Sequence, residues 1–100
     1  MSSLLAEEPH VWWLSGELTF TTVGALLAEF TTQRASRPDP QIVDLSKVDR
    51  TDSAGLALLI EMLKQTRAAP ITFHNIPDQM LALATVSGVQ DLLMGTSSHQ

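Results

Sequence analysis

The chain has 100 residues, and its six Lys and Arg against eleven Asp and Glu give a formal net charge of −5 at pH 7. This acidity argues against binding to nucleic acid and against adhesion to anionic lipid, because both need clustered positive charge. The chain contains no cysteine, which excludes a disulfide framework and a thiolate metal site. No segment approaches the roughly 18 consecutive apolar residues of a membrane span. We therefore expect one cytoplasmic domain, without cofactor, metal or direct membrane insertion.

The first third of the chain predicts two strands and a helix. Ser3 to Glu7 suggests a short edge strand, and His10 to Leu18 is rich in strong strand formers. Alternation along the second strand places Trp12 inside and Trp13 on an open face or under the N-terminal segment. Apolar residues at helical spacing then predict a helix over about residues 22–34, packed on the sheet: Val23, Leu26, Leu27 and Phe30.

The central stretch combines a strand, a sharp turn and a helix. Residues 42–45 predict the strand, and residues 46–51 predict a polar loop. The segment Asp52-Ser53-Ala54-Gly55 then begins a helix that extends to about Arg67. Its apolar residues lie on one face: Leu56, Leu59, Ile60 and Leu63. Either Asp52 or Ser53 suits the N-cap, and a helix N-terminus also suits an anion or a phosphorylated side chain.

Leu58 and Met62 fall one turn apart on the side of this helix that points away from the sheet. A fully solvated face would more often carry charge. We therefore expect Leu58 and Met62 to form an exposed apolar patch, continuous with Ser53, that docks a partner protein. The alternative is that the helix over residues 22–34 covers both side chains, and their solvent exposure distinguishes the two possibilities.

The last third predicts one more strand and one more helix. Ile71 to Ile76 alternates as a strand, in which His74 is an ordinary strand residue rather than a catalyst. Pro77 to Ser87 predicts a helix, and Gly88 is its expected C-cap. After this helix, three apolar residues are expected to return to the core: Val89, Leu92 and Leu93.

The order strand, strand, helix, strand, helix, strand, helix predicts a single α/β domain over residues 1–100. We expect a mixed β-sheet with about three helices, mostly on one face. The core should span about residues 3–94, and residues 95–100 should form a frayed tail.

Two short motifs in the central stretch resemble the STAS domain family (sulfate transporter and anti-sigma factor antagonist). In that family, an apolar strand ending near Asp-Leu-Ser leads into Asp-Ser/Thr-x-Gly-Leu and a helix. The matching residues are Asp44-Leu45-Ser46 and Asp52-Ser53-Ala54-Gly55-Leu56. Within the family, the chain looks most like the stand-alone STAS subunit of the Mla phospholipid-transport ABC system, and more distantly like anti-sigma factor antagonists.

The resemblance implies the same α/β fold and a non-enzymatic role. It implies a cytoplasmic accessory subunit that binds the ABC ATPase subunit of a transporter, and through it lies beside the membrane permease at the inner membrane. Such a subunit supports the assembly or activity of the ATPase in maintaining outer-membrane lipid asymmetry. Ser53 matches the family position whose Thr or Ser is associated with function, and the resemblance implies that role for Ser53 only. We expect the partner contact to include its neighbours Asp52, Ala54 and Gly55 as well. We expect no bound lipid.

Two other functions of Ser53 remain open. An anti-sigma factor antagonist would be switched by phosphorylation of Ser53, because phosphate adds about −1.5 to −2 charges beside Asp52. A hydrolase would use Ser53 as a nucleophile, but the G-x-S-x-G elbow is missing because Thr51 stands two residues before Ser53. No catalytic residue is assigned.

Overall fold

Strands and helices alternate through most of the computed structural model, which describes residues 2–93. The elements in chain order are β1 (Ser3–Leu5), β2 (Val11–Leu18), α1 (Val23–Ser36), β3 (Ile42–Thr51), α2 (Ser53–Gln65), β4 (Thr72–His74), α3 (Asp78–Ser87) and α4 (Gln90–Leu93). The strands form one sheet in the order β1-β2-β3-β4, in which β1 is antiparallel to β2 and the other neighbours are parallel.

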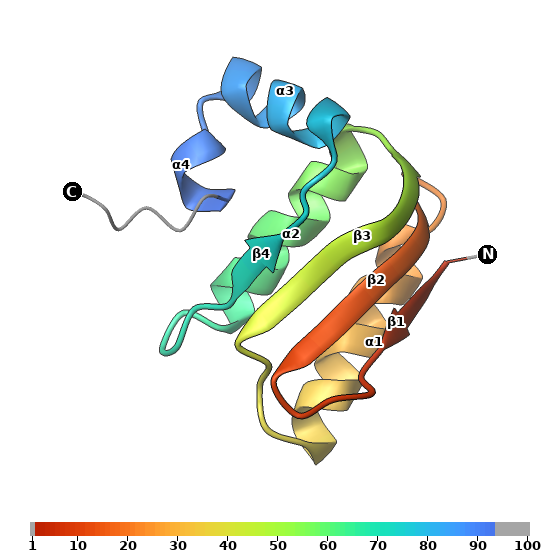
Figure 1. Cartoon of the computed structure of the whole chain (residues 1–100), viewed down its shortest axis with the longest axis vertical. Coiled ribbons are helices and arrows are strands. Elements are labelled where there is room, and N and C mark those ends of the chain that lie inside the picture. The colour runs from red at the N-terminus through yellow and green to blue at the C-terminus, as the bar shows by residue number, and fades with distance from the viewer. Residues whose placement is uncertain (1, 94–100) are drawn as a thin grey trace.

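The helices leave one face of the sheet open. Figure 1 shows α1 and α2 lying side by side behind the sheet, while α3 and α4 pack beside α2. The predicted α/β class with a mixed sheet and helices mostly on one face is therefore confirmed. The short helix α4 is an addition to the three helices predicted from the sequence.

The core lies between the sheet and the pair of helices α1 and α2. Trp12 on β2 is fully buried, and its ring meets Phe30 of α1 edge-on, with 5.7 Å between ring centroids. Trp13 points to the open face, where it is half-buried beside Leu5 of β1. The Lys47 ammonium lies 5.5 Å from the centroid of the Trp13 ring. The predicted division between the two tryptophans is confirmed, because one face of the strand is covered by helices and the other is not.

The predicted polar loop over residues 46–51 is wrong, because β3 continues as a strand to Thr51. This half of β3 pairs with the end of β2, through Leu18 opposite Thr51, after two shifts in register. Four of its polar side chains are exposed to solvent, which suits a strand with an uncovered surface: Ser46, Lys47, Asp49 and Arg50. One of them, Arg50, forms an exposed ion pair with Glu17, with 3.7 Å between nitrogen and oxygen.

The last third is close to the prediction, with two differences. Strand β4 is shorter than expected, because Asn75 adopts a left-handed backbone conformation with φ of 58° and turns the chain. Gly88 ends α3 with φ of 77°, which confirms the predicted C-cap. Leu93 returns to the core, whereas Leu92 is 54% exposed, so the core prediction is wrong for Leu92. The predicted frayed tail, residues 95–100, lies outside the described residues.

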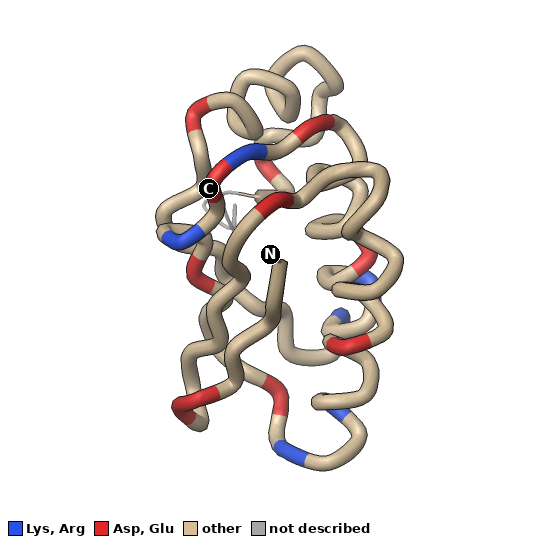
Figure 2. Tube along the Cα trace, turned by 90° about the vertical axis from the view of Figure 1, so that its right-hand side faces the viewer, with Lys and Arg blue, Asp and Glu red and all other residues tan. Residues whose placement is uncertain are grey.

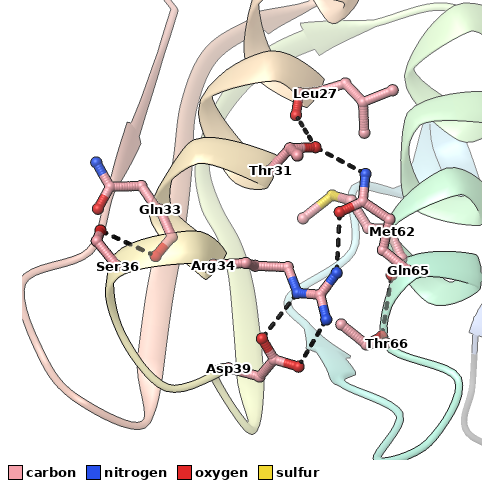
Figure 3. A network of polar contacts seen from close by, with 9 residues as sticks. All are labelled: Leu27, Thr31, Gln33, Arg34, Ser36, Asp39, Met62, Gln65 and Thr66. Carbon is pink, nitrogen blue, oxygen red and sulfur yellow. Dashed lines mark hydrogen bonds and ion pairs between the residues drawn. The ribbon is translucent and has the colours of Figure 1, made fainter.

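A polar network joins α1 to α2 at the C-terminal ends of both helices (Figure 3). The Arg34 guanidinium donates two hydrogen bonds to the Asp39 carboxylate, at 2.7 and 3.0 Å, and a third to Gln65 of α2 at 3.0 Å. The Gln65 amide donates in turn to the Thr31 hydroxyl at 2.8 Å. The hydrogen bond to Asp39 raises the pKa of Arg34, and burial opposes this rise. The network closes this end of the helix pair.

Candidate protein-docking site

The candidate site is built around the first turn of α2. Asp52 is extended and caps the helix, because its Oδ1 accepts a hydrogen bond from the backbone N–H of Ala54 at 2.8 Å. Its Oδ2 accepts a second hydrogen bond, from the backbone N–H of Phe20 at 3.2 Å. Asp52 is therefore the N-cap, and it also ties the loop before α1 to the start of α2.

Gly55 lets α2 approach the end of β2 closely. The Leu18 carbonyl accepts hydrogen bonds from the backbone N–H of Asp52 at 3.2 Å and from the Thr51 hydroxyl at 3.1 Å. A Cβ at position 55 would lie 2.7 Å from that carbonyl oxygen and would overlap the Thr51 hydroxyl. Gly55 is buried, so its part in the site is to position α2 rather than to meet a partner directly.

Ser53 is the first residue of α2, and its side chain is exposed. Among residues 2–93 its hydroxyl takes part in none of the side-chain hydrogen bonds, because Asp52 performs the capping. The unpaired backbone N–H groups and the positive end of the helix dipole lie at the same turn. Ser53 is thus placed where a partner protein or a modifying enzyme would reach it.

An apolar groove of about 160 Å³ lies beside Ser53, between the N-terminal halves of α1 and α2. Its lining is Val23, Gly24 and Leu27 from α1 with Ala54, Ala57, Leu58 and Glu61 from α2. Glu61 is the only charged residue of this lining. The groove would therefore accept an aliphatic or aromatic side chain, with an acidic group at one end.

The predicted exposure of Leu58 and Met62 is wrong. Leu58 is 3% exposed and Met62 is fully buried. Both side chains belong to the core because α1 lies against α2, so the side of α2 that turns away from the sheet faces the neighbouring helix and not solvent. Leu58 still lines the floor of the groove, whereas Met62 lies at the closed end of the helix pair, near Arg34 (Figure 3).

A second polar cluster surrounds Asp44 on the open face of the sheet. Its carboxylate accepts hydrogen bonds from the backbone N–H of Ser46 at 2.7 Å and from the Asn75 amide at 2.9 Å. Burial pushes the pKa of Asp44 upward, but the hydrogen bonds and the nearby His74 outweigh it, and the net pKa lies below its ordinary value of 3.8.

His74 lies opposite Asp44 in the register of β3 and β4. Seven residues of β3 separate Asp44 from Thr51, which places His74 roughly 23 Å along the sheet from the first turn of α2. A general base must lie within hydrogen-bond reach of the group that it activates. His74 is therefore not placed to activate Ser53, which agrees with its interpretation as an ordinary strand residue.

The charged groups do not gather into a basic surface. Figure 2 shows Lys and Arg scattered along the chain and interspersed with Asp and Glu. Over residues 2–93, no three His, Asp or Glu side chains come together as metal ligands. No helix in that range has both the length and the apolar character needed to cross a bilayer. The features that distinguish the site are a hydroxyl, an apolar groove and an ordered loop.

Sequence reasoning missed Phe20, which lies in the loop before α1 and is 84% exposed. The sequence of this loop looks polar because Thr19, Thr21 and Thr22 surround the aromatic residue. Phe20 could have been identified as a surface residue from the sequence, because it is a large apolar residue that does not fit the helical spacing of the apolar residues after it.

The fold is that of a STAS domain, and comparison with known families supports the same class. The family described as "Mlab, STAS domain" matches residues 5–95, so the chain belongs to the MlaB-like branch of the STAS family. Comparison with curated proteins finds no significant match.

Solved structures show the same fold at low sequence identity. The anti-sigma factor antagonist SpoIIAA in its unphosphorylated form is 17% identical, with 85% of this chain and 82% of that chain covered and a TM-score of 0.60. A sulfate transporter family protein from Wolinella succinogenes is 13% identical, with coverages of 93% and 77% and a TM-score of 0.62. The structure titled Mglu is 23% identical with a TM-score of 0.55; the match covers 77% of this chain but only 20% of that one.

Proposed function

We propose that this chain is a non-catalytic accessory subunit of an Mla-type ABC phospholipid transporter. It binds the cytoplasmic ATPase subunit and supports its assembly or activity, and it thereby lies beside the inner membrane with the permease. The observation that carries this proposal is the exposed Ser53 hydroxyl at the start of α2, next to an apolar groove, in a chain of the MlaB-like family.

The groove supports protein docking better than ligand binding. Pockets for small molecules usually enclose about 300–1,000 Å³. The groove between α1 and α2 holds about 160 Å³, which is enough for one side chain of a partner. We accordingly propose that the chain carries no lipid of its own, and that its part in lipid transport is exerted through the ATPase.

The test is co-purification of the tagged chain from its native cells in mild detergent. Wild type should recover an ABC ATPase with its membrane permease. Ser53→Glu should lose both, because a carboxylate at a close-packed contact would have to be desolvated. Gln79→Glu is the matched control, since it adds the same charge at an exposed position in the first turn of α3. Recovery of the transporter by Ser53→Glu as well would remove Ser53 from the contact.

A second candidate is an anti-sigma factor antagonist that is switched by phosphorylation of Ser53. The exposure of this hydroxyl and the similarity of the fold to SpoIIAA favour it. Phosphate at position 53 would meet the positive end of the α2 dipole but would stand beside the Asp52 carboxylate, and it would repel an acidic partner surface. Recovery of a serine kinase or an anti-sigma factor in the same experiment, without the ATPase, would establish this function instead.

A further inference from the structure

Three large apolar side chains are strongly exposed in residues 2–93: Phe20 at 84%, Val86 at 88% and Leu92 at 54%. Single apolar residues on a surface are common and by themselves indicate nothing. Phe20 differs from the other two in its position, because its backbone is hydrogen-bonded to Asp52, the N-cap of the helix that presents Ser53.

The loop that carries Phe20 is held at several points. The Thr22 hydroxyl donates to the Glu17 carbonyl at 2.8 Å and accepts from the backbone N–H of Thr19 at 2.9 Å. The backbone N–H of Phe20 itself donates to Asp52 Oδ2 at 3.2 Å. An exposed aromatic ring on an ordered loop loses less conformational entropy on binding than one on a mobile loop. Phe20 is therefore preorganised to enter a pocket of another protein.

The backbone of Phe20 is also linked to residues that line the groove. Asp52 holds the backbone of Phe20 through one oxygen and that of Ala54 through the other, and Ala54 lines the groove. On the opposite wall, Val23 follows Phe20 by three residues and begins α1. A protruding ring, an exposed hydroxyl and an apolar hollow thus belong to one surface, which we call the Phe20 surface and define as Phe20, Ser53 and the groove lining.

We propose that Phe20 anchors the contact with the ABC ATPase by entering an apolar pocket of the ATPase, while an apolar ATPase side chain flanked by Lys or Arg fills the groove. This inference rests on the proposed function and adds the anchor and the chemistry of the partner surface. Buried aromatic anchors contribute much of the binding energy of many protein interfaces.

Charge decides between the ATPase and a second copy of this chain as the occupant of the groove. One acidic group, Glu61, lies in the Phe20 surface, and a second, Asp52, lies beside it between Phe20 and Ser53. In a symmetric dimer the same patch meets itself, so these carboxylates would face their own counterparts. Lys64 is paired with Glu61 on an exposed part of α2, so it adds no unpaired positive charge to this surface. A basic partner surface fits this arrangement, and an identical acidic one does not.

The test measures the affinity of the purified chain for the purified Mla-type ATPase from the same cells. Phe20→Ala should weaken binding by about thirtyfold or more, as expected for loss of an anchor. Val86→Ala, which truncates an equally exposed side chain on α3, should bind like wild type. Both variants should unfold at the wild-type denaturant concentration, because neither side chain is buried. A photoreactive aromatic residue at position 20 should crosslink to the ATPase, and one at position 86 should not.

The outcomes separate the two proposals. Binding of wild type and Phe20→Ala with equal affinity, without a crosslink from position 20, overturns the anchor and leaves the proposed function standing. Absence of binding by wild type overturns both. A wild-type dimer that Phe20→Ala dissociates, seen by sedimentation without the ATPase, assigns the groove to a second copy and overturns the inference.

Discussion

The two ends of the α1 and α2 pair are held together in different ways. At the C-terminal ends, Arg34 of α1 bonds Gln65 of α2 and is held in place by Asp39 of the following loop, and Met62 is fully buried. At the N-terminal ends, no described side chain of one helix bonds a side chain of the other. Asp52 holds only the backbone of the loop before α1, and an apolar groove lies between the helices. The closed end stabilises the pair, so the open end can leave an apolar surface uncovered for a partner.

The largest expected effect tests this difference in packing. Met62→Ala should lower the free energy of unfolding by about 2–5 kcal/mol, because it leaves a cavity at the closed end. Leu58→Ala should fall at the lower end of that range, since the space that it leaves joins a groove already open to solvent. Urea unfolding of both variants gives the comparison. A cost below about 0.5 kcal/mol for Met62→Ala would be that of a surface residue and would contradict its burial.

At the open end, glycine to alanine substitutions at two positions should change the stability of the fold in opposite directions. Gly55→Ala should destabilise the chain by about 1–3 kcal/mol, because the added methyl overlaps Thr51 and the Leu18 carbonyl. Gly24→Ala should stabilise it by about 0.5–1 kcal/mol, since a Cβ there meets nothing within 4 Å and alanine favours the helix. Thermal unfolding of the pair measures both. Equal shifts in the midpoint would show that α2 does not approach β2 as described.

The two ion pairs on α1 and α2 should differ in strength. Asp39→Ala should cost about 1 kcal/mol, because it removes two charge-assisted hydrogen bonds from the partly buried Arg34. Glu61→Ala should cost less than about 0.5 kcal/mol, because its bond to Lys64 is exposed to solvent. Urea titrations at low and high salt provide the measurement. A larger loss for Glu61→Ala than for Asp39→Ala would contradict the stabilising role of the Arg34 network.

The smallest expected effect is a change of stability with pH, and it comes from Asp44, which lies outside the helix pair. The pKa of Asp44 is below its ordinary value of 3.8 in the folded chain, so the ionised carboxylate stabilises the fold above that value. This contribution is lost as the pH falls through the folded pKa. Asp44→Asn should therefore be less stable than wild type at neutral pH. The difference between their free energies of unfolding should disappear in acid. A difference in free energy of unfolding that stays constant with pH would show that the charge of Asp44 does not contribute to stability.

Residues close together in the sequence account for the predictions that are confirmed. Alternation along one strand separates Trp12 from Trp13, and the positive φ of Gly88 follows from its place after a helical pattern. The segment that begins at Asp52 predicts a helix start, because an N-cap needs only its own side chain and the next two residues. Each of these features depends on local geometry.

The wrong predictions for residues 46–51 and for Leu58 and Met62, and the missed residue Phe20, all depend on neighbours distant in sequence. Residues 46–51 form a strand because β2 is available for pairing, which composition does not reveal. Phe20 is part of the site because Asp52, 32 residues later, holds its backbone. The helical face that carries Leu58 is buried by α1 rather than by the sheet.

By itself, the amino-acid sequence determined the class of fold, the turn that presents Ser53 and the faces of the individual elements, because periodicity and capping act over a few residues. Only the tertiary structure decided which of those faces are covered. Packing of α1 against α2 buried Leu58 and Met62, closed one end of the pair through Arg34 and left the groove at the other. The physical reason is that burial and hydrogen-bond partners are properties of two surfaces in contact, and one segment of sequence specifies only its own.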